Sequence, residues 1–213
     1  MKKILVAAVA FFACQTVYAD QWYVGAGAGL GYASDASNNV ASDNTALAQY
    51  GIVEITSYNN RSGTFSLLGG YRFNDYVAAE LDYTFLGYFD MYGYTATGHT
   101  QPSGSEENWT GALALAAVLT APVSDTFSLY GKFGPTLTVN EVSTCTSDVW
   151  WCEDNSDIRN GMVFGIGTSI TPPRLLGAIR VEFDRFNHVG DTQNEFTAGR
   201  FSLLQVQYVY TFK

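Results

Sequence analysis

The sequence predicts an all-β protein, an eight-stranded antiparallel up-and-down transmembrane β-barrel with four long external loops. Three observations lead to this prediction. Eight segments of about ten residues alternate apolar with small or polar side chains, as strands between two environments do. The connections between these segments alternate in length. Tyr, Phe and Trp gather near the segment ends of the apolar face, as they do in interfacial girdles.

The first residues are predicted to be a signal peptide rather than part of the barrel. Two lysines precede an apolar run, residues 4–13, which is too short to cross a bilayer as a helix. The small residue Ala19 places the cleavage site, so residues 1–19 form the signal peptide and residues 20–213 the barrel domain. An uncleaved anchoring helix and lipid attachment at Cys14 are the alternatives.

Net charge narrows the classes of partner. Removal of the two leader lysines leaves 9 basic and 20 acidic residues, a formal charge of −11. There is no basic run, so nucleic acid is a poor partner. No stretch after residue 19 has 18 consecutive apolar residues, and no transmembrane helix is predicted.

The first four segments already separate a lipid face from a lumen face. In the first, Trp22, Val24 and Leu30 alternate with glycines, which leave room inside a narrow barrel for long side chains from opposite strands. In the next two, aromatic and aliphatic residues alternate with Arg72 and Glu80. The four predicted strands are residues 22–32, 64–73, 77–86 and 109–119.

The last four predicted strands keep the alternation with two irregularities. They are residues 127–139, 161–170, 175–186 and 200–212. Pro135 cannot donate to a strand ladder, so we expect a bulge there or a position near the outer rim. Phe201 and Leu203 fall on the polar phase, which predicts a bulge or the emergence of the strand from the membrane.

The connections sort into two kinds. Three are short, near Asn74, Pro122 and Pro172. Four are long, comprising residues 33–63, 87–108, 140–160 and 187–199. Short periplasmic turns and long external loops are typical of outer-membrane barrels, and an even strand number puts both termini in the periplasm. A soluble β-sandwich or lipocalin-like barrel is the alternative, because the charged face would then meet water.

Charged residues of the lumen face are predicted to form a network that plugs the barrel. An eight-stranded barrel is only wide enough for side chains, and buried charges must pair. The predicted network consists of Arg72, Glu80, Asp82, Lys132, Arg180, Glu182 and Asp184.

Residues 68–83, with the sequence LGGYRFNDYVAAELDY, resemble the second-to-third strand hairpin of the OmpA-like outer-membrane β-barrel superfamily. Residues 22–29 look like the first strand of that group and residues 207–212 like the last. The resemblance implies a location in the outer membrane of a Gram-negative bacterium, among its lipids and lipopolysaccharide. It also implies insertion by the barrel-assembly machinery through a last strand that ends at Phe212, although Lys213 follows. A monomer without a cofactor or a peptidoglycan-binding domain is expected.

The predicted external loops carry the negative charge, with 13 acidic residues against two basic ones, Arg61 and Arg159. The acidic residues are Asp35, Asp43, Glu54, Asp90, Glu106, Glu107, Glu141, Asp148, Glu153, Asp154, Asp157, Asp191 and Glu195. Solubility is the simplest interpretation. Binding of a divalent cation or of a basic partner is the alternative, but there is no EF-hand spacing and no metal site is predicted.

One loop contains the best local candidate for ligand contact. Cys145 and Cys152 remain after leader removal, and an even pair in an exported chain predicts a disulfide. Trp150 and Trp151 lie inside the loop that this bond would close. They are predicted to contact an extracellular ligand, and packing on neighbouring loops is the alternative.

The predicted function is that of a non-enzymatic structural or surface-interaction barrel with a plugged lumen. A small pore or hydrophobic-ligand conduit is the main alternative, because glycines on the lumen face could leave a gap. An enzyme is disfavoured. The only histidines are His99 and His188, and no G-x-S-x-G or H-E-x-x-H motif is present.

Overall fold

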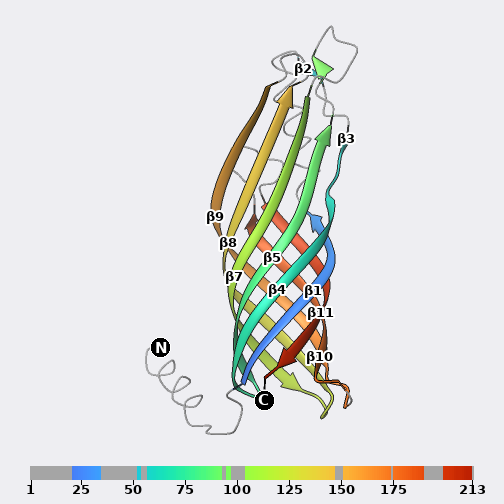
Figure 1. Ribbon diagram of the computed structural model, residues 1–213, viewed down its shortest axis with the longest axis vertical. Coiled ribbons are helices and arrows are strands. Elements are labelled where there is room, and N and C mark those ends of the chain that lie inside the picture. The colour runs from blue at the N-terminus through green and yellow to red at the C-terminus, as the bar shows by residue number, and fades with distance from the viewer. Residues whose placement is uncertain are drawn as a thin grey trace.

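The computed structural model describes residues 21–34, 52–53, 57–92, 95–96, 104–146, 151–173, 175–189 and 199–212. Eight long antiparallel strands form a closed barrel (Figure 1). They are β1 (Gln21–Ala33), β4 (Arg61–Asn74), β5 (Val77–Tyr92), β7 (Gly104–Pro122), β8 (Phe127–Thr146), β9 (Trp151–Ile170), β10 (Gly177–Val189) and β11 (Gly199–Thr211). Three two-residue strands, β2 (Ile52–Val53), β3 (Ser57–Tyr58) and β6 (Thr95–Ala96), complete the set.

The strand order confirms the predicted up-and-down topology. Each long strand pairs with the next along the chain, and the first pairs with the last, with Tyr23 opposite Thr211. The backbone N–H of Phe212 donates to the carbonyl of Trp22 at 2.9 Å. The first and last described residues therefore lie at one end of the barrel, which also carries the short turns, and we call it the short-turn end.

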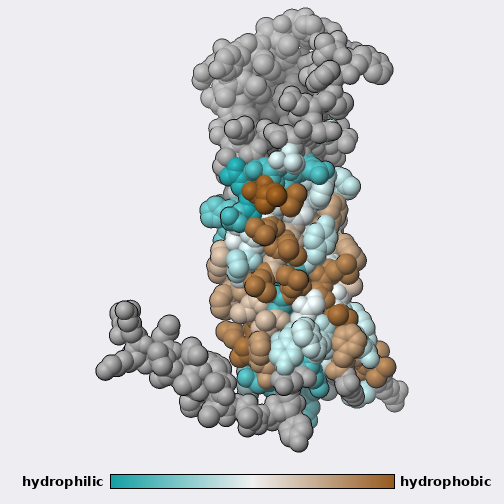
Figure 2. Space-filling model, turned by 60° about the vertical axis from the view of Figure 1, so that its left-hand side comes forward, coloured by the Kyte–Doolittle hydropathy of each residue, from teal (hydrophilic) through white to brown (hydrophobic). Residues whose placement is uncertain are grey.

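Side-chain burial follows the predicted two faces. On the outside, Leu115 and Ile166 are 59% and 68% exposed, whereas Tyr23 on the lumen face is 1% exposed. Apolar side chains occupy much of the visible wall of the barrel in Figure 2, with residues of intermediate hydropathy between them. A barrel with apolar residues outside and polar residues inside is the inverse of a soluble one, because lipid rather than water faces the outer wall.

Local side-chain hydrogen bonds hold two of the short turns. The Asn74 side-chain oxygen accepts from the backbone N–H groups of Tyr76 and Val77, both at 2.9 Å. Ser124 Oγ accepts in the same way from Thr126 and Phe127. Asn and Ser favour such turns because their side chains replace a backbone acceptor. The third short turn lies between β9 and β10, and β10 begins at Gly177 rather than at the predicted Leu175.

Four neighbouring strands are longer than predicted. β5, β7, β8 and β9 continue beyond the other strands as a sheet (Figure 1). Much of the predicted loops 87–108 and 140–160 is therefore strand. We call residues 88–92, 104–109, 141–146 and 151–156 of these four strands the extended sheet.

A bulge marks the start of the extended sheet in β5. The register between β5 and β7 shifts between Phe85 and Gly87, and Gly87 has a φ of +123°. The backbone N–H of Tyr88 donates to Ser62 Oγ of β4 at 3.1 Å. A β-carbon at Gly87 would collide with the Ser62 side chain, so glycine is required both by conformation and by space.

Neither of the two predicted irregularities takes the form expected for it. The register of β8 is constant through Pro135, which lies in mid-strand, so the predicted bulge is absent. Instead, the ladder to β7 is interrupted between the Ala114–Thr136 and Ala117–Phe133 pairs. Phe201 and Leu203 keep a regular register and point into the barrel, where they are 2% and 0% exposed.

Candidate functional site

The middle of the lumen contains a network of ion pairs between strands on opposite sides of the barrel. Arg180 Nη1 of β10 donates to Glu80 Oε1 of β5 at 2.6 Å. The Tyr23 hydroxyl of β1 donates to the same oxygen at 2.7 Å. The Arg180 guanidinium also lies over the rings of Tyr23 and Tyr130, at 5.3 and 5.0 Å. Three strands are thus tied together across the lumen.

Lys132 of β8 is the centre of the second half of the network. Its Nζ contacts Glu182 Oε1 at 2.6 Å, Asp82 Oδ2 at 3.0 Å and Asp184 Oδ2 at 3.3 Å. All four side chains are almost fully buried. A buried ammonium stabilises a structure only when its charge and its donors are satisfied, and three carboxylates achieve both here.

Neutral side chains complete the network. Gln205 Nε2 donates to Glu182 Oε1 at 3.0 Å and to Asp184 Oδ2 at 2.9 Å, and its oxygen accepts from Ser66 Oγ at 2.7 Å. The Tyr130 hydroxyl donates to Glu182 Oε2 at 2.8 Å. Alternation predicts that Gln205 and Tyr130 face inward, but only their contacts identify them as partners of the charges.

Six of the seven predicted lumen charges belong to this network, and Arg72 does not. Its guanidinium lies 5.7 Å from the Tyr23 ring, near the short-turn end. Within the described part of the chain Arg72 makes no ion pair. The sequence predicts which face Arg72 occupies but not its height in the barrel relative to the carboxylates.

Close backbone approaches make room for the large lumen side chains. The Tyr23 ring lies over Gly70 of β4, where a β-carbon would overlap it. The Tyr130 ring lies over Gly167 of β9 in the same way. These two lumen glycines therefore receive aromatic rings from the neighbouring strand, rather than from an opposite strand as predicted, and do not leave an open channel at this level.

An apolar layer fills the lumen on the long-loop side of the network. Its buried members are Leu86, Ala112, Ala114, Val163, Phe186, Val189, Phe201 and Leu203. The rings of Phe186 and Phe201 meet edge to face, with centroids 6.5 Å apart. Because these side chains are at most 4% exposed, the layer closes the barrel between the charge network and the long loops.

The predicted loop residues lie at the tip of the extended sheet. Cys145 of β8 and Cys152 of β9 are directly opposite in the register, and Trp151 is opposite Thr146. Trp150 lies outside the described residues. The backbone pairing brings the two cysteines to the spacing that a cross-strand disulfide needs, but the bond itself stays a prediction.

Neither histidine lies in a catalytic arrangement with an acid and a serine among the described residues. His188 is exposed at the end of β10, with a φ of 59°, whereas Asp184 is buried against Lys132. Ser202 is opposite Arg185 rather than His188, and His99 is not among the described residues. No set of three His, Cys, Asp or Glu side chains suited to a metal ion occurs in the described ranges.

The residues that the structure describes include no helix long and apolar enough to cross a membrane.

These features identify the class of protein. It is an integral β-barrel of the outer-membrane type, with an apolar outer wall and a lumen filled by charged and apolar side chains. The family model described as the OmpA-like transmembrane domain matches residues 17–213, and the chain belongs to this family.

Individual relatives are distant. Outer membrane protein A of Escherichia fergusonii and that of Shigella dysenteriae are each 27% identical over 158 residues. The match covers 73% of this chain but only 42% of those proteins, so the chain spans about two fifths of their length.

Solved structures show the same fold. Ail, the attachment invasion locus protein of Yersinia pestis, solved with the heparin analogue sucrose octasulfate, has a TM-score of 0.51 at 12% identity, covering 92% of this chain and all of Ail. Neisserial surface protein A has a TM-score of 0.50 at 15% identity, covering 90% of this chain and 97% of that one. In outer-membrane barrels the short turns lie at the periplasmic end and the long loops outside.

Proposed function

We propose that this protein is a non-enzymatic outer-membrane barrel whose extended sheet is a contact surface for an extracellular partner. One observation carries this proposal. β9 pairs with β10 only from Met162 onward, and residues 151–158 have β8 on one side and no strand on the other among the described residues. The unpaired backbone groups of such an edge are a template for an extended segment of another protein.

The charge of the extended sheet favours a basic partner. Its four segments contain six acidic residues and no basic one. The register sets Asp90 of β5 directly opposite Glu107 of β7. Like charges in directly opposite positions destabilise a sheet, and a bound cationic segment would relieve that repulsion.

This charge argues against a ligand of the kind found with Ail. Sucrose octasulfate is a polyanion, and the predicted external segments here have 13 acidic residues against two basic ones. A polyanion would meet repulsion over most of this surface. We therefore expect this protein not to bind the heparin analogue, in spite of the shared fold.

The Cys145–Cys152 disulfide is part of the proposal. The two residues face each other in the last rows of the hairpin, and a bond there would fix the tip with Trp150 and Trp151 beside it. A pinned tip presents aromatic side chains at a lower entropic cost than a free loop does.

The test uses the full mature barrel in lipid nanodiscs and an immobilised peptide of alternating Lys and Val. We expect binding that weakens as salt rises and that falls at least fivefold in Glu153→Gln/Asp154→Asn. Asp75→Asn, at the opposite end of the barrel, is the matched control and should bind as the parent does. Equal binding by both variants, or tighter binding of sucrose octasulfate than of the peptide, would contradict the proposal.

The variant Cys145→Ser tests the role of the disulfide at the tip of the extended sheet. An unchanged affinity for the peptide would show that binding does not need the disulfide.

The proposal also covers how the protein is exported and how it is inserted into the membrane. We infer that residues 1–19 are removed during export and that the last strand, ending at Phe212, is the segment through which the barrel inserts. The intact mass of the membrane-extracted protein should correspond to a chain that begins at Asp20. A mass that retains the leader would contradict the processing step.

A further inference from the structure

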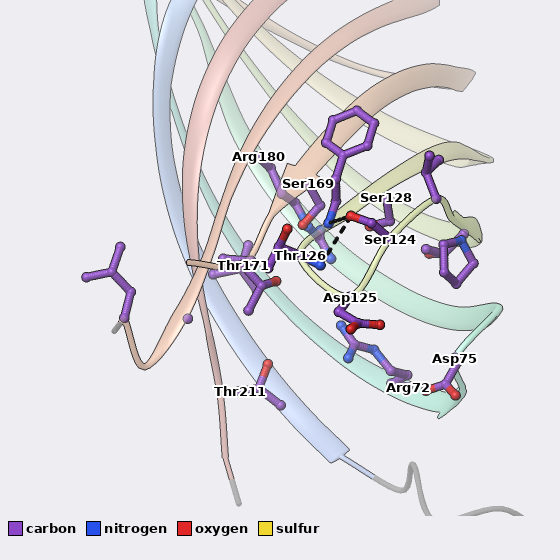
Figure 3. Close-up of a pocket in the computed structure, with 18 of the residues that line it drawn as sticks. Arg72, Asp75, Ser124, Asp125, Thr126, Ser128, Ser169, Thr171, Arg180 and Thr211 are labelled. Carbon is purple, nitrogen blue, oxygen red and sulfur yellow. Dashed lines mark hydrogen bonds between the residues drawn. The ribbon is translucent and has the colours of Figure 1, made fainter. Parts of the chain in front are cut away.

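The lumen opens at the short-turn end, which we take to be the periplasmic end, into a polar cavity of about 880 Å³. Figure 3 shows Arg72 entering it from β4, Arg180 from β10, and hydroxyl groups from several strands around them. Among the lining residues are Ser128, Ser169 and Thr211. The charge network and the apolar layer lie above, so the cavity is a pocket with one mouth.

Arg180 forms the inner end of this cavity. It is 5% exposed, and its only hydrogen bond to another described residue is the one from Nη1 to Glu80. Arg180 is among the residues that line the cavity. The rings of Tyr23 and Tyr130 hold the guanidinium in place. A guanidinium has five donors, and the bond to Glu80 uses one of them.

Two hydroxyl groups flank Arg180 in the strand register. Arg180 of β10 is opposite Ser169 of β9, and Ser169 is opposite Ser128 of β8. Side chains in one cross-strand row lie on the same face, so both serines face the lumen in the row of Arg180, and both line the cavity. Neither hydroxyl makes a hydrogen bond to another described residue.

Arg72 adds a second positive charge without a protein partner. Its guanidinium lies over the same Tyr23 ring as Arg180 does, and within the described ranges it makes no ion pair. Asp75 and Asp125 line the cavity mouth but are exposed to solvent, which weakens their effect. Arg72 itself is half-buried, so its charge is less screened by solvent than the charges of the two aspartates.

We propose that this cavity binds the oxyanion group of a small periplasmic solute, a phosphate or a carboxylate. Arg72 supplies the uncompensated charge, and the remaining donors of Arg180 with the hydroxyls of Ser128 and Ser169 supply directed hydrogen bonds. Arginine donors match both oxyanions geometrically, and a recessed site strengthens each contact. A single arginine without a carboxylate partner, together with the open mouth, predicts an affinity in the millimolar range.

The test is a chemical-shift titration of the full mature barrel in nanodiscs. Sodium phosphate and sodium acetate are added in separate experiments at constant ionic strength, with sodium chloride as the reference. We expect saturable shifts of the Ser128, Ser169 and Thr211 amide signals with at least one oxyanion. Saturation by phosphate alone identifies a phosphate site, saturation by acetate alone a carboxylate site, and saturation by both a general oxyanion site.

Three variants complete the test. Arg72→Gln should weaken binding at least tenfold with a well-dispersed spectrum, and Asp125→Asn should tighten it two- to fivefold. Arg185→Gln removes an arginine that does not line the cavity and should change nothing. Linear shifts equal to those with chloride, or an unchanged affinity in Arg72→Gln, would show that the cavity has no oxyanion site built on Arg72. The external peptide assay is independent of these outcomes.

Discussion

Lys132 shows how strongly one buried side chain determines the interior of this barrel. Its ammonium contacts three carboxylates that come from two strands, β5 and β10. Each of these acids would be an uncompensated buried charge without it, and the cost of such a charge exceeds what the ion pair contributes when intact. The loss of Lys132 would therefore cost more free energy, by leaving buried carboxylates unpaired, than the intact ion pairs contribute to stability.

Replacement of Lys132 by Met is expected to destabilise the barrel by about 3–5 kcal/mol, because it leaves buried charges unpaired. Urea unfolding in lipid vesicles, followed by tryptophan fluorescence, measures the change. Arg72→Gln is the matched control, since it removes a lumen cation without an ion pair and should cost less than about 1 kcal/mol. Equal losses in the two variants would mean that the network does not depend on Lys132.

At the scale of single residues, the sequence predicts which face of the barrel wall a residue occupies better than it predicts which residues that side chain contacts. A period of two decides which side of a strand each residue occupies, and all seven predicted charges lie on the lumen side. Which charged side chains contact each other depends on the stagger between strands, and the period of the sequence does not determine that stagger. For this reason the predicted network wrongly includes Arg72 and omits Tyr23 and Ser66.

At the scale of the strand, the bulge in β5 is the element that redirects the chain into the extended sheet. Gly87→Ala should destabilise the protein by about 1–3 kcal/mol, because alanine is strained at this φ and its β-carbon meets Ser62. Gly63→Ala, where a β-carbon meets nothing within 4 Å, is the control. Comparison of their urea midpoints tests this, and a smaller loss at Gly87 than at Gly63 would contradict it.

The ends of the strands are harder to predict than their middles. Within the membrane, lipid requires alternation, and segments such as 127–139 are located correctly. Beyond it, polar residues are acceptable on both faces, so residues 140–146 and 151–160 look like loop although they are paired strand. The wrong prediction for Phe201 and Leu203 has a related cause, because an apolar lumen layer breaks the assumption that the inner face is polar.

For the whole molecule, the apolar layer predicts that the barrel does not conduct ions. We expect no steady openings of the parent protein in planar bilayers. The double variant Phe186→Ala/Leu203→Ala removes large side chains from the layer and should produce measurable openings. Val181→Ala/Phe183→Ala, which changes the lipid face of the same strand region, is the control and should stay silent. Steady conductance of the parent would favour the pore alternative.

The fold class of the molecule could be predicted from the sequence almost completely, whereas its candidate binding sites could be predicted only in part. Strand number, topology and the two faces all follow from the period and the turn residues of the sequence. The unpaired β9 edge and the pocket around Arg72 and Arg180 could not be foreseen. Both depend on strand lengths and stagger, and these are set by pairing across the whole barrel.

The unequal strand lengths make the molecule asymmetric around the barrel axis, so its sides differ in the plane of the membrane. A short cylinder of eight equal strands would look alike from every side, but here the sheet of β5, β7, β8 and β9 rises on one side, while β10, β11, β1 and β4 stop lower (Figure 1). A partner bound along the β9 edge would rest on the low side, above the lipid headgroups. Its access would then depend on which neighbours crowd that side, so lateral packing in the membrane could regulate binding without any change in the barrel itself.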